Sequence, residues 1–482
     1  MNETPIGLKW RAGFWYVTFV VWLGISVDIL VYSIIVPVIP FRLEKLGYDN
    51  VSSRAGWLLF SYSVGLVLAT IPTAMISERY NARQRPLVFG ILLLIVAIIM
   101  LMEAPVYWLM VIARFLQGLA STLVWVPGLA LLCDTVTENV VGRQMGITLS
   151  GISFGFLLGP PVGGALYDRF GFRGTCLFGV IAAFVDLIFR LIVIERKDAL
   201  KWDFDPQIGA VNTTRPGDNA SASAEQKNAD GVVANVSQTN ENENADTPPS
   251  EPNSEGTSKV HLSLAAVVLF LLKEPRAWTS ILCILISGII ATLLEAPLPV
   301  HMNRVWNFDS QKVGLVFIAS VVPSFVSTLL AGYFSDKFGA APVMSIGLVL
   351  AIPFWISITY DILALFIVSF AVELFFISGA FAPLNAELAH VSRATEGIGY
   401  AHVSGAFNIA YGVGSAVGPI IGGQVFDHVK NGWPVLCYIA IGLVAATATL
   451  VFFGLGDESL FSKTRRFLDR RKSSDLPSSG ST

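Results

Sequence analysis

Charged residues are scarce in this sequence. Asp, Glu, Lys and Arg make up 14% of the 482 residues, against roughly 25% in an ordinary soluble domain. Apolar residues make up 54%. This balance excludes a soluble globular protein and predicts an all-α, multi-pass membrane protein. The formal net charge of −3 arises from charges spread over loops, so no basic patch points to a nucleic-acid partner.

Cysteine is also rare. The four cysteines lie in or beside apolar runs and lack the paired spacing of a disulfide framework or a metal site. We predict that they are small buried side chains. No metal-ligand cluster, nucleophile triad or nucleotide-binding loop occurs in its required context. We therefore expect no enzymatic activity, no metal and no bound cofactor.

Apolar runs of the length that crosses a bilayer, about 20 residues, recur along the chain. We expect twelve membrane spans in two groups of six, at 14–40, 57–76, 86–102, 107–133, 145–167 and 174–194, and then at 277–299, 314–334, 342–360, 362–389, 404–426 and 434–454.

Polar segments divide the chain around these spans. Residues 203–258 are rich in Asn, Ser, Ala, Glu and Pro and cannot bury a core, so they are predicted to be disordered. The expected regions are an N-terminus (1–13), a first six-helix half (14–194), a linker (195–276), a second six-helix half (277–454) and a basic tail (455–482).

Lys and Arg concentrate on one side of the predicted spans, the side of both termini and the linker. By the positive-inside rule this side is cytosolic. Asn50, in an Asn-Val-Ser sequence of the first outer loop, is then the expected glycosylation acceptor. Two locations are compatible with the sequence: the plasma membrane, and the membrane of an organelle such as a vacuole, vesicle or peroxisome.

A pattern of glycine and proline occurs twice, 259 residues apart. The first copy lies in the fifth span and the second in the eleventh. Two six-helix halves with the same order are parallel repeats, the arrangement of secondary transporters that move two halves around a central site. The matched positions are Gly146, Gly155, Gly159, Pro160, Gly163 and Gly164, and then Gly405, Gly414, Gly418, Pro419, Gly422 and Gly423.

The first copy satisfies Gly-x8-Gly-x3-Gly-Pro-x2-Gly-Gly. On this motif the sequence resembles the major facilitator superfamily, and within it the twelve-helix drug:proton antiporters. The fourth span adds the Arg-x2-Gln-Gly motif as Arg114, Gln117 and Gly118. The resemblance implies an antiporter driven by a proton gradient. It also implies that the glycine helices act in gating, whereas small-residue stripes alone are compatible with ordinary helix packing.

Two proline-containing segments are similar to the vesicular amine transporters. They are Val36 to Pro40, with Asp28 upstream, and Leu294 to Pro299. This chain has Asn408 where the eleventh helix of those proteins carries a carboxylate, and Ser63 where their second helix carries a lysine. The resemblance therefore covers the helical scaffold, whereas part of the set of charged residues that binds an amine in those proteins is missing here.

Ionisable groups within predicted spans are expensive to insert and are candidate sites for that reason. Asp28 lies near the middle of the first span and is the expected proton or cation carrier, with a structural role as its alternative. Glu295 is a second candidate or an interfacial residue, while Arg114 and Glu373 occupy equivalent positions in spans that line the central cavity of this superfamily. The full candidate proton and substrate set is Asp28, Arg114, Gln117, Trp125, Glu295, Glu373 and Asn408.

Charges at the cytosolic helix ends form a second set. By resemblance they hold the inner surfaces of the two halves together when the cavity faces outward; they also serve as topology-setting charges. They are Glu78, Arg79, Arg83, Asp336 and Lys337.

The sequence thus predicts a proton-coupled antiporter that exports or compartmentalises a drug, toxin or secondary metabolite. A uniporter or proton symporter of an organic solute and a non-transporting membrane receptor are the alternatives. The expected partners are a small-molecule substrate and the lipid bilayer, with the protein acting as a monomer.

Overall fold

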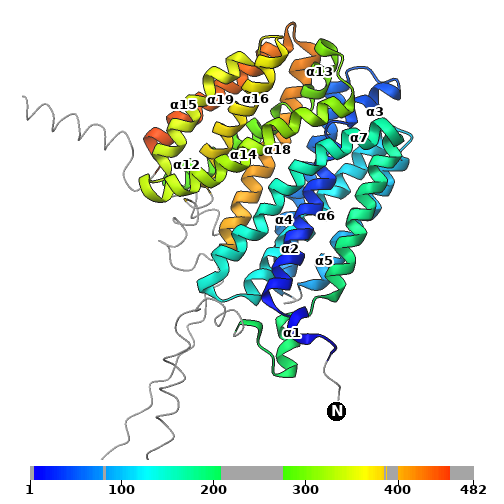
Figure 1. The fold of residues 1–482 in the computed structure, drawn as a ribbon, viewed down its shortest axis with the longest axis vertical. Coiled ribbons are helices and arrows are strands. Elements are labelled where there is room, and N and C mark those ends of the chain that lie inside the picture. Colours follow the sequence, from blue (N-terminus) through cyan, green and yellow to red (C-terminus); the bar gives the residue numbers. More distant parts are fainter. Residues whose placement is uncertain (1–4, 80–82, 208–274, 385–386, 388–399, 456–482) are drawn as a thin grey trace, which may run out of the picture.

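Helices are the regular elements of the described part of the chain. The computed structural model describes residues 5–79, 83–207, 275–384, 387 and 400–455. The predicted disordered segment beyond Gln207 and the basic tail after Leu455 lie outside these residues. Figure 1 shows α1 and the N-terminus at one end of the bundle, which we call the terminal end, and α3 and α13 at the other, which we call the far end.

The first half contains the helices α1 (Leu8–Arg11), α2 (Phe14–Ser33), α3 (Ile39–Lys45), α4 (Val51–Arg79), α5 (Gln84–Glu103), α6 (Tyr107–Thr135), α7 (Glu138–Ile192) and α8 (Arg196–Ala199), followed by the short 3-10 helix η1 (Leu200–Trp202). The second half contains α12 (Pro275–Leu293), α13 (Pro297–Trp306), α14 (Ser310–Phe338), α15 (Ala340–Ser357), α16 (Leu363–Phe381), α18 (Tyr400–His428) and α19 (Gly432–Gly454).

Eleven helical stretches of the described chain are long and apolar enough to cross a membrane. One of them contains α7, whose 55 residues would extend for about 80 Å at 1.5 Å per residue, far more than the roughly 30 Å of hydrocarbon. The chain turns back within α7 at Gly171, where φ is 68° and ψ is −170°. This helix therefore supplies two spans, and the expected all-α fold with twelve spans is confirmed.

Two predicted spans are not continuous helices. The span predicted at 14–40 breaks between Ser33 and Ile39, and the one predicted at 277–299 breaks between Leu293 and Pro297. Each break contains or adjoins a proline, which cannot donate the helical backbone hydrogen bond. The break in the second half places Glu295 in a turn. In the predicted tenth span, α16 ends at Phe381, and residues 385, 386, 388 and 389 of that span lie outside the described part.

The repeated glycines bring helix backbones together within each half. A Cβ added at Gly155 would lie 2.7 Å from Cβ of Ile29 on α2, and Gly159 and Gly163 meet Ser33 and Ile34 at still closer range. Glycines thus allow α7 to lie directly on α2.

The second copy does the same with α18 on α12. Gly414 meets the backbone of Leu285, Gly418 would place a Cβ 2.6 Å from the carbonyl oxygen of Ile289, and Gly422 meets the carbonyl oxygen of Leu293. Gly146, by contrast, has open space beside it. The glycine pattern therefore seats the first helix of each half, although not at every position of the motif.

The last glycine of each copy faces the opposite half. Gly164 on α7 lies against Ser310 of α14, whose hydroxyl donates to the Gly164 carbonyl oxygen at 3.1 Å. A Cβ at Gly423 on α18 would lie 2.5 Å from the carbonyl oxygen of Ser52 of α4. Two seams, α7 with α14 and α4 with α18, therefore join the halves toward the far end.

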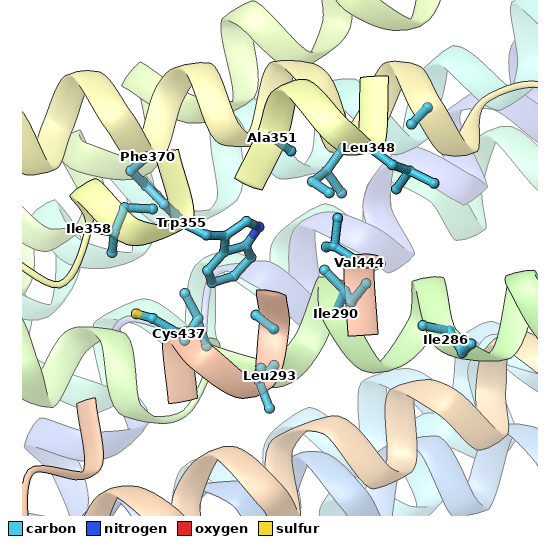
Figure 2. Packing of buried hydrophobic residues seen from close by; sticks show 14 of the residues in the cluster. Ile286, Ile290, Leu293, Leu348, Ala351, Trp355, Ile358, Phe370, Cys437 and Val444 are labelled. Atoms are coloured by element: carbon cyan, nitrogen blue, oxygen red, sulfur yellow. The ribbon is translucent and has the colours of Figure 1, made fainter. Parts of the chain in front are cut away.

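The second half has its own apolar core, shown in Figure 2. Trp355 of α15 is 2% exposed and lies among Ile358 at the end of the same helix, Phe370 of α16 and Cys437 of α19. Cys176 and Cys283 are buried as predicted, as is Cys437, whereas Cys133 is exposed.

The start of the predicted linker is folded onto the first half. Glu195 accepts hydrogen bonds from the backbone amides of Arg83 and Gln84, at 3.1 and 2.6 Å, at the start of α5. Arg196 pairs with Asp205 through two hydrogen bonds, of 2.9 and 2.8 Å, and these bonds hold the pKa of Asp205 below its usual value. Residues 195–207, at the start of the predicted linker, are therefore held against the first half.

The close packing of α18 on α12 predicts that Gly422→Ala destabilises the protein, because the new methyl group overlaps the Leu293 carbonyl. Overpacking of this kind costs about 1–3 kcal/mol. Thermal unfolding of the purified protein in detergent should show a lower Tm for Gly422→Ala. Gly442→Ala is the matched control, since Gly442 of α19 has open space beside it. Equal melting temperatures for the two variants would contradict the packing described.

Candidate functional site

Asp28 is a fully buried carboxylate on α2. Its Oδ2 accepts hydrogen bonds from the Ser121 hydroxyl at 2.6 Å and from the Trp125 indole at 2.9 Å. These two donors are one helical turn apart on α6, so they lie on the same face. Asp28 Oδ1 is buried and has no hydrogen-bond partner among the described residues. One oxygen is therefore fixed by the protein and the other is left to accept a proton or a ligand.

A pair of tyrosines extends this site toward the second half. The Tyr62 hydroxyl donates to Ser121 at 3.0 Å, and the Tyr62 ring lies 4.7 Å, centroid to centroid, from that of Tyr32. Tyr32 in turn donates a 2.5 Å hydrogen bond to Glu295 Oε2. Because Glu295 lies in the turn between α12 and α13, this bond connects the polar sites of the two halves.

Arg114 is buried beside the tyrosines. Its Nη1 donates to Gln117 Oε1 at 2.9 Å, and its guanidinium carbon lies 5.7 Å from the centre of the Tyr32 ring, a cation–π distance. Arg114 Nε and Nη2 and Gln117 Nε2 are buried without hydrogen-bond partners among the described residues. An Arg held in this way is a costly feature of a membrane protein, which marks it as a candidate anion or carboxylate partner.

The other two predicted site residues lie outside this network. Glu373 of α16 is 2% exposed, and within the described chain it forms no side-chain hydrogen bond and no ion pair with Arg114 or another residue. Asn408 of α18 is half-buried. The structure therefore joins Asp28, Arg114, Gln117, Trp125 and Glu295 through shared contacts, and leaves these two apart.

A further buried pair lies close to the site. Arg190 Nη2 and Asp186 Oδ1, four residues apart on α7, are 3.7 Å from each other. Their side chains pack against Gly24, where a Cβ would lie 3.4 Å from Asp186 Oδ2. Gly24 is one turn before Asp28 on α2, so the pair borders the site, and its two opposite charges offset each other.

The residues predicted to form the cytosolic gate lie at helix ends. Glu78 and Arg79 end α4, but their side chains fall outside the described part. Arg83 Nε binds Asp134 Oδ2 of α6 at 2.9 Å, a contact within one half. Asp336 and Lys337 are exposed near the end of α14, and Asn50 is exposed in the loop before α4.

Sequence reasoning missed Tyr32, Tyr62 and Ser121. The two tyrosines were indistinguishable from the other aromatic residues of the chain, most of which pack or lie at interfaces. Helical spacing offered a signal, since Tyr32 is one turn after Asp28, and Ser121 is one turn from both Gln117 and Trp125.

Two parallel six-helix halves with charged groups buried between them define a secondary transporter. The Major Facilitator Superfamily profile matches residues 21–305 and 280–475. The chain belongs to this superfamily. It is a multi-pass membrane transporter of an organic substrate and does not belong to an enzyme class.

The chain is similar in sequence to a fungal MFS-type transporter and to a vesicular amine transporter. The MFS-type transporter ppzB of Metarhizium rileyi (strain RCEF 4871) is 26% identical over 480 residues, covering 94% of this chain and 98% of the relative. The synaptic vesicular amine transporter of Rattus norvegicus is 25% identical over 409 residues, covering 82% of this chain and 65% of the relative.

Solved structures share the fold. A D-xylose-proton symporter aligns with a TM-score of 0.62 at 16% identity, covering 92% of this chain and 98% of the symporter. The human organic anion transporter MFSD10 aligns with a TM-score of 0.59 at 16% identity, covering 93% of this chain and all of MFSD10.

The hydrogen bond between Tyr32 and Glu295 predicts energetic coupling between the halves. A hydrogen bond to a charged group contributes about 1.5–3 kcal/mol. A double-mutant cycle of Tyr32→Phe and Glu295→Gln should therefore give a coupling energy of that size in the free energy of unfolding. The measurement is a dodecyl sulfate titration in mixed micelles followed by circular dichroism.

The control cycle pairs Tyr32→Phe with Glu103→Gln, because Glu103 binds Arg173 at the surface. Distant sites add to within about 0.5 kcal/mol. A Tyr32–Glu295 coupling no larger than this control would show that the bond does not join the halves.

Proposed function

We propose that this protein is a proton-coupled antiporter that moves a small organic molecule by alternating access. The observation that carries the proposal is the state of Asp28, which is fully buried, held through one oxygen by Ser121 and Trp125, and free at the other. A group built in this way exchanges a proton without losing its position.

Protonation changes the charge of the site by one unit in a low-dielectric region, where electrostatic interactions are strong. With a proton on Oδ1, Asp28 is neutral and compatible with burial. Without it, the negative charge requires compensation by Arg114 or by a cationic group of the cargo. Proton and cargo therefore compete for the same site, and binding of one favours release of the other.

Glu295 gives the second half a part in this exchange. Its carboxylate accepts from Tyr32, whose ring lies over Arg114. A change of charge at Arg114 or Glu295 alters the hydrogen bond between Tyr32 and Glu295, which spans the halves. This bond is a physical link between binding of a proton or cargo and movement of the halves. Glu373, buried in the second half, is proposed as a further proton site.

The proposed cargo is a drug, toxin or secondary metabolite rather than a monoamine in particular. Relatives named as vesicular amine transporters support an organic cargo. The seam between α4 and α18 is neutral at Ser63, whose hydroxyl accepts from Ser415 at 3.2 Å. Asn408 adds no charge there, so the charge set of an amine carrier is incomplete.

Sidedness follows from the distribution of Lys and Arg. We propose that the terminal end faces the cytosol and the far end faces the outside or an organelle lumen, with the protein acting as a monomer. The glycine helices α7 and α18 would then carry the gating movement at the two seams, with the helix-end charges from Glu78 to Arg83 and Asp336 to Lys337 meeting when the terminal end closes.

Asp28→Asn is expected to abolish pH-driven accumulation while the protein stays folded, because the amide cannot exchange a proton. Proteoliposomes with an acidic interior would be incubated with a cell metabolite extract and a panel of amphipathic drugs. Compounds that accumulate would be identified by mass spectrometry, with and without collapse of the gradient by nigericin.

Wild-type protein and the surface variant Glu103→Gln should accumulate the same compounds, and Asp28→Asn should match empty vesicles. Gel filtration checks folding. Undiminished accumulation by Asp28→Asn would refute the assigned carrier. Uptake by the wild type that is unchanged by nigericin and stops at the outside concentration would refute proton coupling and favour the uniporter alternative.

A further inference from the structure

The seam between α4 and α18 contains a polar contact that the repeat does not explain. At the far end, Asp427 of α18 accepts a hydrogen bond through Oδ2 from the backbone amide of Ser53 of α4, at 2.7 Å. Gln424, one turn earlier on α18, donates to the Ser53 hydroxyl at 2.6 Å. Both contacts join the second half to the first turn of a helix in the first half.

The start of the equivalent helix in the second half shows what this contact replaces. Helix α14 is capped by its own Asp309, which accepts from the amide of Lys312 at 2.8 Å. The residue that precedes α4 in the same way is Asn50, whose carbonyl oxygen accepts from the amide of Arg54 as that of Asp309 does from the amide of Val313. Asn50 has a φ of 51°, in the left-handed region, whereas a capping residue adopts extended backbone angles from which its side chain reaches the second or third amide of the helix.

Asp427 therefore performs across the halves the function that Asp309 performs within its own helix. Ser53 is the third residue of α4 and Lys312 the third residue of α14, so the same amide position is satisfied in both cases. A carboxylate at a helix N-terminus also gains from the helix dipole.

Asp427 is held in place by a second group. Its side chain is 2% exposed, and Arg304 Nη2 lies 3.8 Å from Oδ1. Arg304 itself extends from α13 and packs 5.0 Å over the Phe426 ring. The carboxylate is thus fixed by its own half and directed at the other.

The other seam lacks this contact. Asp168 stands on α7 where Asp427 stands on α18, 259 residues later. Asp168 is exposed, and its side chain forms no hydrogen bond or ion pair within the described chain. With α14 capped by Asp309, the α7 and α14 seam closes through the Ser310 hydroxyl and the glycines.

We propose that Asp427, supported by Arg304 and Gln424, is a one-sided latch that holds the far end closed by capping α4 from the opposite half. Opening the far end requires α4 to lose its cap, whereas the other seam opens without this cost. The latch rests on the proposed movement of the halves, but not on the identity of the cargo or the coupling ion.

The test measures far-end opening without cargo, in full-length protein reconstituted into nanodiscs with its four cysteines replaced by serine. Spin labels at the exposed positions Asp49 and Lys430 report the distance between the halves at this end. Asp427→Ala should raise the ratio of open to closed populations about fivefold, the factor that corresponds to loss of a typical helix cap. Asp168→Ala is the matched control and should leave the ratio unchanged.

A second readout applies if the open population is too small for spectroscopy. Ser310→Cys places a thiol at a buried position of the other seam, so its rate of reaction with a maleimide rises in proportion to opening. Asp427→Ala should accelerate this reaction by the same factor. Equal rates and equal distance distributions for Asp427→Ala and Asp168→Ala would overturn the latch.

The variant Val51→Asp separates a latch from simple helix capping. Added to Asp427→Ala, it places a carboxylate in the first turn of α4, which stabilises the helix through its dipole without joining the halves, so the ratio should stay elevated. A return to the wild-type ratio would overturn the proposal, since it would show that only the local stability of α4 matters. The two proposals can fail separately. A protein that shows the expected effect of Asp427→Ala on opening but no pH-driven accumulation would keep the latch and refute antiport. A protein that accumulates compounds but opens equally in both variants would keep antiport and refute the latch.

Discussion

Direct backbone contact between helices is the constraint on which the rest of this structure depends. In lipid, apolar side chains gain little by leaving one apolar surface for another, so helices associate through close packing. Glycines provide it here, where α7 lies on α2 and α18 on α12. With Ile29 and Ser33 of α2 fixed against α7, the adjacent face of α2 presents Asp28 to Ser121 and Trp125 of α6. The packing motif therefore also positions the charge.

The repeat supplies the scaffold, and departures from it supply the chemistry. Arg114 and Glu373 stand at matching positions in the two halves, yet one is a cation in the polar network and the other a carboxylate outside it. Glu295 reaches the network because the second half breaks its first helix there. At the far end, Asn50 precedes α4 where Asp309 caps α14, and Asp427 supplies the cap of α4 from across the seam. Two similar halves thus carry unequal charges, which agrees with the proposed coupling of two different ligands.

The membrane spans, the repeat and the ionisable residues within the spans could be predicted from the sequence alone. Asp28, Arg114 and Glu295 could be selected because a charge in a membrane span is rare. Tyr32 and Tyr62 could not, since their role depends on which way each helix is rotated and on a partner far away in the chain. The break after Ser33 was also missed, although Pro37 gave a local signal. The Asp427 contact arises only when the halves meet, so no local pattern in the sequence predicts it.

The central claim is that a proton and an organic molecule exchange through one site. The most direct measurement is the steady-state accumulation of a transported compound in proteoliposomes as the imposed pH difference is varied. For electroneutral one-for-one exchange, the account predicts that the ratio of inner to outer concentration rises about tenfold for each pH unit. A ratio that stays at unity whatever the pH difference would contradict it.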